Sequence, residues 1–404
     1  VPRQTSVGIL YLTVTKFLVF RPHRHEGKVT GLAAFGNPNK HIGIMKEAVS
    51  LTRDGKFIRK INVNPMKIYW LMFKRLLKNR FIRHPEINLI LDHLESNLHG
   101  FRKEDVAASV QIHTEDLLSN FVKRWLELTK QKKVALAGGI FANVLVNQRI
   151  AELPGVEKVY VQPNMGDGGT ALGAAILTWQ RFLEEQRKVL MPKYLTDVYL
   201  GPEYSDKEVE MAIRRAKLSG KAKRVKNIER IAAEAVAKGK IVGWFQGRME
   251  FGPRALGNRS LLALPTDRNI NQTLNDRLKR TEFMPFAPSM LAEDAKDYIK
   301  YRPQSEYPSR FMTITFDCTA KAKKQTPAVV HVDGTARPQI VDKKTNHRYH
   351  KLISEYKKLT GLSSLVNTSF NIHEEPIVCS PDDAIRSYKL NSCDALAMEN
   401  WWIE

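Results

Sequence analysis

The pattern of apolar and polar residues along the chain predicts helices alternating with short buried strands. Apolar residues at helical spacing predict helices over residues 6–20, 104–130, 205–218 and 227–238. Short apolar runs predict strands over residues 133–137, 156–162 and 240–246. Residues 49–63 are predicted to form a β-hairpin with Asp54-Gly55 at its turn. This alternation is typical of an α/β protein.

The same pattern continues to the C-terminus. Strands are predicted over residues 310–317, 328–332, 339–341, 362–366 and 395–398, and helices over residues 346–359 and 381–389. Ser380 precedes the last helix and is predicted to cap it. Residues 65–84 combine apolar and basic side chains, which predicts a basic amphipathic helix that packs on its own domain rather than on a membrane.

Glycine-rich corners follow two of the predicted strands. Gly138 and Gly139 turn the chain from the strand at 133–137 into a helix that carries Asn143 and Asn147. Asp167 lies between glycines after the strand at 156–162. Two such corners indicate a ligand bound at helix N-termini. Asp167 is a candidate for a metal or a ligand hydroxyl, but spacing alone favours an N-cap of the following helix.

The densest polar stretch is the loop Gly247–Ser260, GRMEFGPRALGNRS, which follows the strand at 240–246. It combines three glycines, three arginines and one carboxylate, a composition that suits a phosphate or carboxylate ligand. The alternative is a basic loop paired with surface acids. The cations that could converge on one anion are Arg254, Arg259, Lys279, Arg280 and Arg337. Asn367 and Ser369 either orient a planar amide or carboxylate, or close a local turn.

Composition narrows the class of protein. There are 64 Lys and Arg against 42 Asp and Glu, which gives a net charge of +22 and favours polyanionic or phosphorylated ligands. Three widely spaced cysteines without a C-x-x-C indicate a reducing, cytoplasmic setting. No apolar run is long enough to span a bilayer. The sequence contains no Walker loop, no G-x-S-x-G motif and no zinc-type Cys/His spacing. We therefore expect the protein to stabilise the charge of a phosphorylated substrate during group transfer rather than to form a covalent intermediate.

Seven motifs together resemble the nodulation-type O-carbamoyltransferases. Those of the first half are EGKVTGLAAFG, LAGGIFANVLVNQRI and VQPNMGDGGTALGAA. Those of the second half are GRMEFGPRALGNRS, KRTEFMPFAP, DGTARPQ and VNTSFNIHEEPIVCSPDDA. The likeness extends nearly from end to end, and so many motifs in one order make it specific.

The resemblance implies two domains. Residues 1–195 would be part of a sugar-kinase/actin-like (ribonuclease H-like) lobe, similar to that of the universal tRNA threonylcarbamoyl-adenosine synthase, and residues 196–404 a YrdC-like α/β domain. In the family, the YrdC-like domain forms carbamoyl-adenylate from carbamoyl phosphate and ATP with Mg²⁺. The other domain transfers the carbamoyl group to a hydroxyl of a sugar or natural-product acceptor, with an iron-like divalent metal.

The resemblance also implies roles for the candidate residues. Catalysis is implied for Arg254, Arg259, Lys279 and Arg337, and substrate binding for Arg280, Asn367 and Ser369. Nucleotide contacts are implied for Gly138, Gly139 and Asn143. Asp167 is implied as a metal ligand, in preference to the cap.

One part of the family pattern has no counterpart in the sequence. The family's N-terminal lobe would precede residue 6 and supply a His-x-x-x-His metal pair. The nearest pairs are His23 with His25 and His347 with His350, and neither has that spacing. We expect this lobe to lie outside the chain, or the protein to be a divergent member. The alternatives are a tRNA-modifying enzyme of the carbamoyl-adenylate type, which the charge would suit, and a non-catalytic nucleotide-binding remnant. Homo-oligomerisation stays open.

Overall fold

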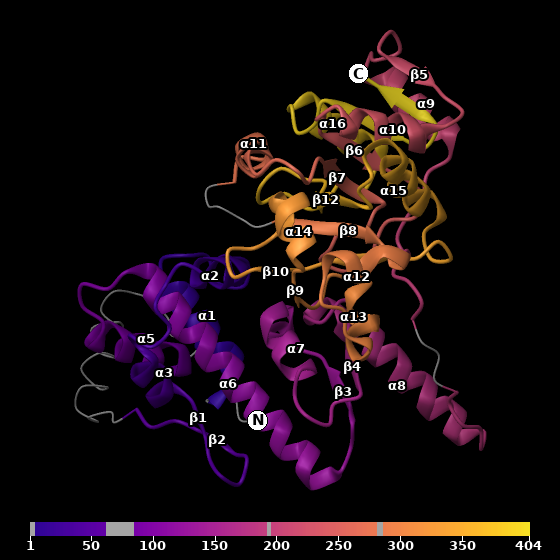
Figure 1. The fold of residues 1–404 in the computed structure, drawn as a ribbon. Coiled ribbons are helices and arrows are strands. Elements are labelled where there is room, and N and C mark those ends of the chain that lie inside the picture. Colours follow the sequence, from indigo (N-terminus) through magenta and orange to yellow (C-terminus); the bar gives the residue numbers. More distant parts are fainter. Residues whose placement is uncertain (1–4, 62–84, 192–194, 281–285) are drawn as a thin grey trace, which may run out of the picture. The chain divides into compact units, whose positions relative to one another are not determined.

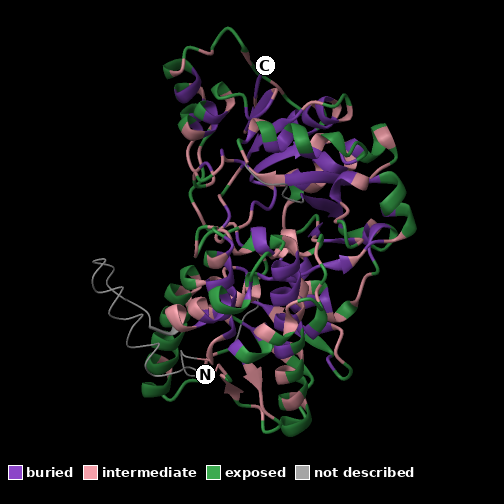
Figure 2. Ribbon diagram, turned by 90° about the vertical axis from the view of Figure 1, so that its left-hand side faces the viewer, coloured by how far each residue is buried: buried purple, intermediate pink, exposed green. Residues whose placement is uncertain are grey.

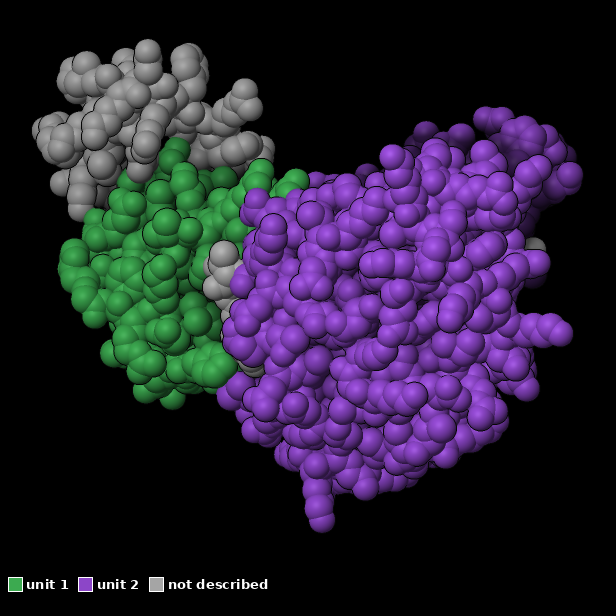
Figure 3. Space-filling view, turned by 90° about the horizontal axis from the view of Figure 1, so that it is seen from above, with its two compact units in different colours: residues 1–132, 149–156 green, residues 133–148, 157–404 purple. Residues whose placement is uncertain are grey.

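The computed structural model describes residues 5–61, 85–191, 195–280 and 286–404. The chain forms two compact units (Figure 1; Figure 3). Unit 1 is Val1–Lys132 with Arg149–Val156, and unit 2 is Lys133–Gln148 with Glu157–Glu404. The family-domain boundary at residues 195 and 196 remains a prediction, since compactness alone does not define family domains. None of the helices in the described ranges has both the length and the apolar character needed to cross a bilayer.

Unit 1 is mainly helical. Its helices are α1 (Val7–Phe17), α2 (Glu26–Ala33), α3 (Ile42–Ala48), α5 (Pro85–Asn97) and α6 (Lys103–Thr129). The strands β1 (Ser50–Leu51) and β2 (Phe57–Ile58) pair antiparallel. Tyr11 ties α1 to α6, because its buried hydroxyl donates to Gln111 Oε1 at 2.9 Å. The structure confirms the helices predicted at 6–20 and 104–130 and the predicted hairpin. The helix predicted at 65–84 lies outside the described residues.

Unit 2 begins with a small parallel pair. β3 (Lys133–Leu136) and β4 (Lys158–Val161) lie side by side in parallel. They are followed respectively by α7 (Val144–Ala151) and α8 (Thr170–Glu185). Both strands were predicted. Because they run in the same direction, the two glycine-rich corners that follow them lie at one edge of this pair.

The main body of unit 2 is a mixed eight-stranded sheet in the order β11-β8-β12-β7-β6-β13-β14-β5. Its strands are β5 (Ala222–Arg224), β6 (Val242–Phe245), β7 (Arg259–Ala263), β8 (Ala287–Leu291), β11 (Gln339–Val341), β12 (Ser364–Ser369), β13 (Ala395–Met398) and β14 (Trp401–Ile403). The pairs β11–β8 and β13–β6 are parallel, and the other neighbours are antiparallel. A separate short pair joins β9 (Phe316–Asp317) to β10 (Thr335–Ala336).

Helices cover both faces of this sheet. The helices of unit 2 beyond α8 are α9 (Asp206–Arg215), α10 (Ile228–Ala237), α11 (Asn269–Arg277), α12 (Ala295–Tyr298), α13 (Glu306–Ser309), α14 (Ala320–Gln325), α15 (His347–Thr360) and α16 (Pro381–Lys389). Side chains of α9, α11 and α16 pack with Phe245 and Leu261 in one core. Side chains of α10 and α15 pack with Trp244 and Leu262 in another. Figure 2 shows the buried strands between helices whose outer faces are exposed.

Three predicted strands need correction. Residues 310–317 pair as a strand only at Phe316–Asp317. At residues 328–332 there is no strand, and a 3-10 turn, Pro327–Val329, overlaps the start of this segment. Pro327 fixes its own φ and lacks a backbone N–H, and the apolar residues after it are buried by packing without strand pairing. The strand predicted at 362–366 continues to Ser369. Asn367 and Ser369 are therefore strand residues, so the local turn suggested for them is wrong.

Candidate anion-binding site

The loops that carry the predicted arginines meet at one edge of the large sheet. β7, β8 and β11 begin at this edge, and β12 ends there, because Ser369 is opposite Ser260 and Asn367 is opposite Ala287. The segments that lead into these three strands contain Arg254, Arg280 and Arg337. Strand register therefore gathers side chains that are far apart in the sequence.

Arg254, Arg280 and Arg337 form a group of neighbouring guanidinium ions. Burial lowers the pKa of Arg337 well below its ordinary value, and the charges of Arg254 and Arg280 lower it further. Burial also lowers the pKa of Arg254, and that of Arg280 to about 10. No ion pair between described residues includes any of the three. A group of like charges with no counter-ion among the described residues favours the binding of an anion.

Few hydrogen bonds between described residues involve the guanidinium groups of Arg254, Arg280 and Arg337. Arg280 Nη2 donates to Thr368 Oγ1 at 3.2 Å, and its guanidinium lies 5.2 Å from the centre of the Phe286 ring. The Nε atoms of Arg254 and Arg337 are buried and have no partner within the described part of the chain. Buried donors of this kind are normally satisfied, so they point to a missing acceptor.

The other two predicted cations lie in different surroundings. Arg259 is fully buried, and its guanidinium lies 3.6 Å from the centre of the Phe245 ring. Its two Nη atoms donate to the backbone carbonyls of Pro202, Gln246, Gly247 and Asn258. In this structure Arg259 supports the loop and is not a member of the three-arginine group. Lys279 is exposed with φ +55°, and its charge contributes to lowering the pKa of Glu375 after the larger effect of Arg386.

Two loop residues that were not among the predicted site residues hold the arginine loop in shape. Glu250 Oε1 accepts hydrogen bonds from the backbone N–H groups of Leu256, Asn258 and Arg259, at 2.6, 2.9 and 3.2 Å. Burial raises the pKa of Glu250, against the opposing effect of these bonds. Gly257 has φ +96°, and its carbonyl accepts from Trp244 Nε1 at 2.9 Å. The lone carboxylate among three arginines was the sequence signal for Glu250.

Asn367 lies beneath the arginine loop, at the centre of a buried polar network. Its Nδ2 donates to Ser289 Oγ at 2.9 Å, to Gln339 Oε1 at 3.0 Å and to the Ala255 carbonyl at 3.3 Å. Its Oδ1 is buried and has no partner among the described residues. Ser369 ends the same strand, half-buried and opposite Ser260. Asn367 thus borders the segments that carry Arg254 and Arg337.

The residues predicted to contact a nucleotide lie at the edge of the β3–β4 pair. Gly138 adopts φ +117°, and its N–H donates to the Met165 carbonyl at 2.7 Å, which links the two corners. No atom lies within 4 Å of a Cβ built on Gly138 or Gly139, so the backbone is open to close approach. Asn143 Oδ1 accepts from Val146 N at 3.3 Å and so caps α7.

Asp167 does not form the cap that spacing favoured. It is exposed, it begins a short 3-10 turn, and α8 starts after Gly169 without a side-chain cap. Within the described ranges, no group of three His, Cys, Asp or Glu side chains close enough to share a metal ion includes Asp167. The described residues therefore do not complete a metal site around it, because structural and catalytic sites ordinarily need three or more protein ligands.

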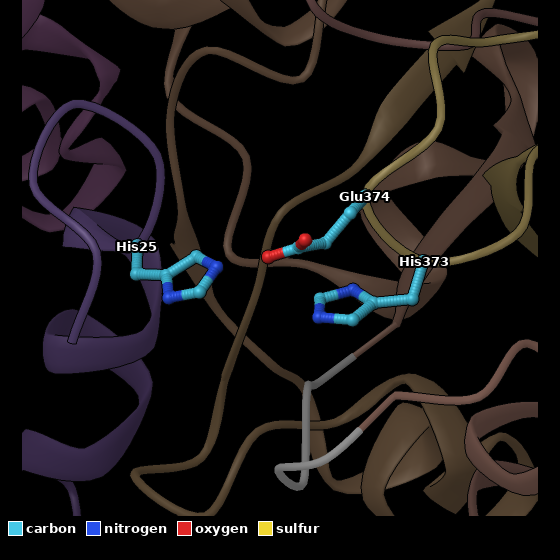
Figure 4. A group of neighbouring side chains, drawn as sticks. All are labelled: His25, His373 and Glu374. Atoms are coloured by element: carbon cyan, nitrogen blue, oxygen red, sulfur yellow. The ribbon is translucent and has the colours of Figure 1, made fainter.

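His373 and Glu374 follow β12 and are drawn in Figure 4 together with His25. His25 belongs to unit 1, whereas His373 and Glu374 belong to unit 2. Glu374 is exposed and has φ +65°. One imidazole and one carboxylate of unit 2 are too few to define a metal centre, so none is assigned to this loop.

Comparison with known proteins agrees with the motifs. Residues 1–176 match the family model described as carbamoyltransferase N-terminus, and residues 233–404 match carbamoyltransferase C-terminus. An uncharacterized protein of Methanocaldococcus jannaschii is 35% identical over 99% of this chain and 62% of its own length. The nodulation protein NolNO of Sinorhizobium fredii is 32% identical, over 100% of this chain and 56% of its own. NolO of Bradyrhizobium diazoefficiens is also 32% identical, over 98% and 68% respectively.

The chain spans 56% to 68% of the length of these three relatives. A solved structure of full-length HypF in a phosphate- and nucleotide-bound form overlaps 44% of this chain at 23% identity, with a TM-score of 0.32, and supports no conclusion at that level. The relatives and the two family models establish the family by themselves, and they confirm the predicted resemblance. The chain belongs to the carbamoyltransferase family.

Proposed function

We propose that this protein is an ATP-dependent O-carbamoyltransferase, or the greater part of one. Unit 2 binds carbamoyl phosphate and ATP, accompanied by Mg²⁺, and forms carbamoyl-adenylate. The carbamoyl group then passes to a hydroxyl of a small-molecule acceptor. Family membership supports the reaction class, and the three-arginine group supports a phosphorylated substrate.

The single observation that carries the proposal is the gathering of Arg254, Arg280 and Arg337 without a carboxylate partner among the described residues. Desolvated cations destabilise one another, and a phosphoryl group would relieve this repulsion by neutralising their charge. Guanidinium forks match phosphate oxygens in geometry and charge. They would also stabilise the negative charge that develops when phosphate or pyrophosphate leaves.

We assign the eight-stranded sheet of unit 2 to a YrdC-like domain, and the segment with β3, β4, α7 and α8 to part of a sugar-kinase/actin-like domain. The separate family matches to residues 1–176 and 233–404 support this division. The open backbone at Gly138 and Gly139 supports a nucleotide at that edge. All three cysteines are free, which supports the proposed reducing, cytoplasmic setting.

A divalent metal would activate the acceptor hydroxyl or polarise the carbamoyl carbonyl if it were bound near Asp167. Among the described residues, no group of three His, Cys, Asp or Glu side chains close enough to share a metal ion includes Asp167, so no step of the reaction is derived through such an ion. The role of Asp167 remains part of the proposal.

The test is carbamoyl phosphate-dependent exchange of pyrophosphate into ATP by the chain and its variants. We expect Arg254→Ala and Arg337→Ala each to reduce the exchange rate about 100-fold or more, since each removes a preorganised charge from the reacting phosphates. The control is Arg214→Ala, because Arg214 is an exposed partner of Glu210 on α9. Unchanged exchange in both site variants would overturn the proposed function.

A further inference from the structure

Gln339, at the start of β11, holds a fixed orientation beneath the arginine loop. It is 3% exposed. Its Nε2 donates to the Leu256 carbonyl at 2.6 Å. A carbonyl oxygen can only accept, so this contact determines which end of the Gln339 amide is nitrogen. Gln339 Oε1 therefore faces the other way, where it accepts from Ser289 Oγ at 2.7 Å and from Asn367 Nδ2 at 3.0 Å.

Gln339 and the Ala255 carbonyl together determine the orientation of Asn367. Because Gln339 Oε1 is an acceptor, Asn367 must present its Nδ2 on that side. The Ala255 carbonyl, 3.3 Å from the same nitrogen, imposes the same choice. A flipped Asn367 would bring its oxygen against two other acceptors. Its Oδ1 is consequently directed away from both, buried and without a partner among the described residues.

An unsatisfied buried acceptor is costly, and here it accompanies unsatisfied donors. Arg254 immediately precedes Ala255, and Arg337 lies two residues before Gln339, so both arginines are close in sequence to groups that contact Asn367. Their Nε atoms are two of the buried donors that have no partner among the described residues. The site therefore presents an acceptor together with guanidinium donors. A complementary ligand has an N–H near an anionic phosphoryl group.

We propose that Gln339 is a positioning residue for substrate selection. By fixing the amide of Asn367, it presents Asn367 Oδ1 to the N–H of a carbamoyl group. A site with this acceptor favours carbamoyl phosphate over an acyl phosphate of the same shape, because a methyl group cannot donate. This inference rests on the proposed function, and it deepens it by stating how the carbamoyl group is recognised.

The probes are two stable phosphonates of nearly equal size. Phosphonoacetamide carries an amide NH₂ where acetonylphosphonate carries a methyl group, and both offer the same phosphonate to the arginines. Calorimetric titration of the full chain measures the Kd of each. We expect the wild-type protein to bind the amide about 10-fold or more tightly, the cost of leaving a buried acceptor unpaired. The ratio of the two Kd values cancels changes that affect anion binding generally.

Two substitutions separate orientation from mere packing. Gln339→Met preserves length but removes the nearer of the two acceptors that fix Asn367. Only the Ala255 carbonyl then favours the observed amide orientation, while Ser289 Oγ can donate to a flipped Asn367, so we expect the Kd ratio to fall toward unity. In Gln339→Glu one carboxyl oxygen still accepts from Asn367 Nδ2, and the other faces the Leu256 carbonyl and must carry a proton to donate to it, so the Kd ratio is retained. Ser364→Ala removes a buried hydroxyl from the same strand, outside the network, and leaves the ratio unchanged.

The outcomes distinguish the inference from the function on which it rests. Equal binding of the two phosphonates by the wild-type protein would overturn the inference and leave the anion site standing. An unchanged ratio in Gln339→Met, or the same loss in Gln339→Glu, would also overturn it. If the wild-type protein binds neither phosphonate, both the inference and the proposed anion site fail.

Discussion

Replacement of Gly257 by alanine tests how tightly the arginine loop is built. Gly257 has φ +96°, a region that alanine rarely adopts. A Cβ placed there would lie 2.2 Å from Cδ1 of Tyr349, far inside van der Waals contact. Tyr349 is fully buried in the core between α15 and the sheet, so it has little room to move. The added methyl must therefore shift either the loop or the core.

The expected cost has two parts. Forcing alanine into a left-handed conformation costs about 1–2 kcal/mol. Overpacking a closely packed core costs a further ~1–3 kcal/mol. The matched control is Gly361→Ala at the end of α15, where φ is +77° and no atom lies within 4 Å of a built Cβ. Gly361→Ala should show the backbone cost alone, so the difference between the variants measures the clash.

Urea denaturation followed by circular dichroism gives the free energy of unfolding of each variant. We expect Gly257→Ala to lose about 2–5 kcal/mol, more than the control by roughly 1–3 kcal/mol. Because the loop also carries Arg254, pyrophosphate exchange should fall in Gly257→Ala and persist in Gly361→Ala. Equal destabilisation of the two variants would refute the argument that the loop is pressed against Tyr349.

Two further substitutions test the groups beside the arginines. Glu250→Ala leaves three buried N–H groups without an acceptor and should lower the free energy of unfolding by about 3–5 kcal/mol in urea denaturation. Glu250→Gln keeps an acceptor and should lower it by less than ~2 kcal/mol. Equal losses in the two variants would contradict the role of Oε1. Burial lowers the pKa of His331 to about 4. The charge of Asp333 raises this pKa and that of Arg337 lowers it further, and the net effect keeps His331 neutral in the folded protein. In the unfolded chain His331 binds a proton near pH 6.5, so the free energy of unfolding falls as the pH decreases from about 6.5 toward 4. His331→Gln should reduce this loss of stability between pH 6.5 and 5 by about 1–2 kcal/mol, as measured by urea denaturation. Parallel curves of stability against pH for the two proteins would contradict this role of His331.

The sequence by itself determined the elements that local interactions specify. Helix α9 starts at a capping box of Ser205 and Glu208, and α16 at one of Ser380 and Asp383, and both starts were predicted. The buried run at β6 was predicted from its apolar side chains. At residues 328–332 the same reasoning failed, because Pro327 directs the backbone into a turn that an apolar run alone does not reveal.

Only the tertiary structure decided how the candidate site is assembled. Arg254 and Arg259 lie on one loop, yet Arg259 is enclosed by carbonyl oxygens whereas Arg254 joins Arg280 and Arg337. Spacing along a loop carries no information on this division, because it depends on which strands pair and at which edge they begin. The orientation of the Asn367 amide depends likewise on partners from other strands and loops. Residue type predicted an anion site, and strand register decided which of the predicted residues lie together.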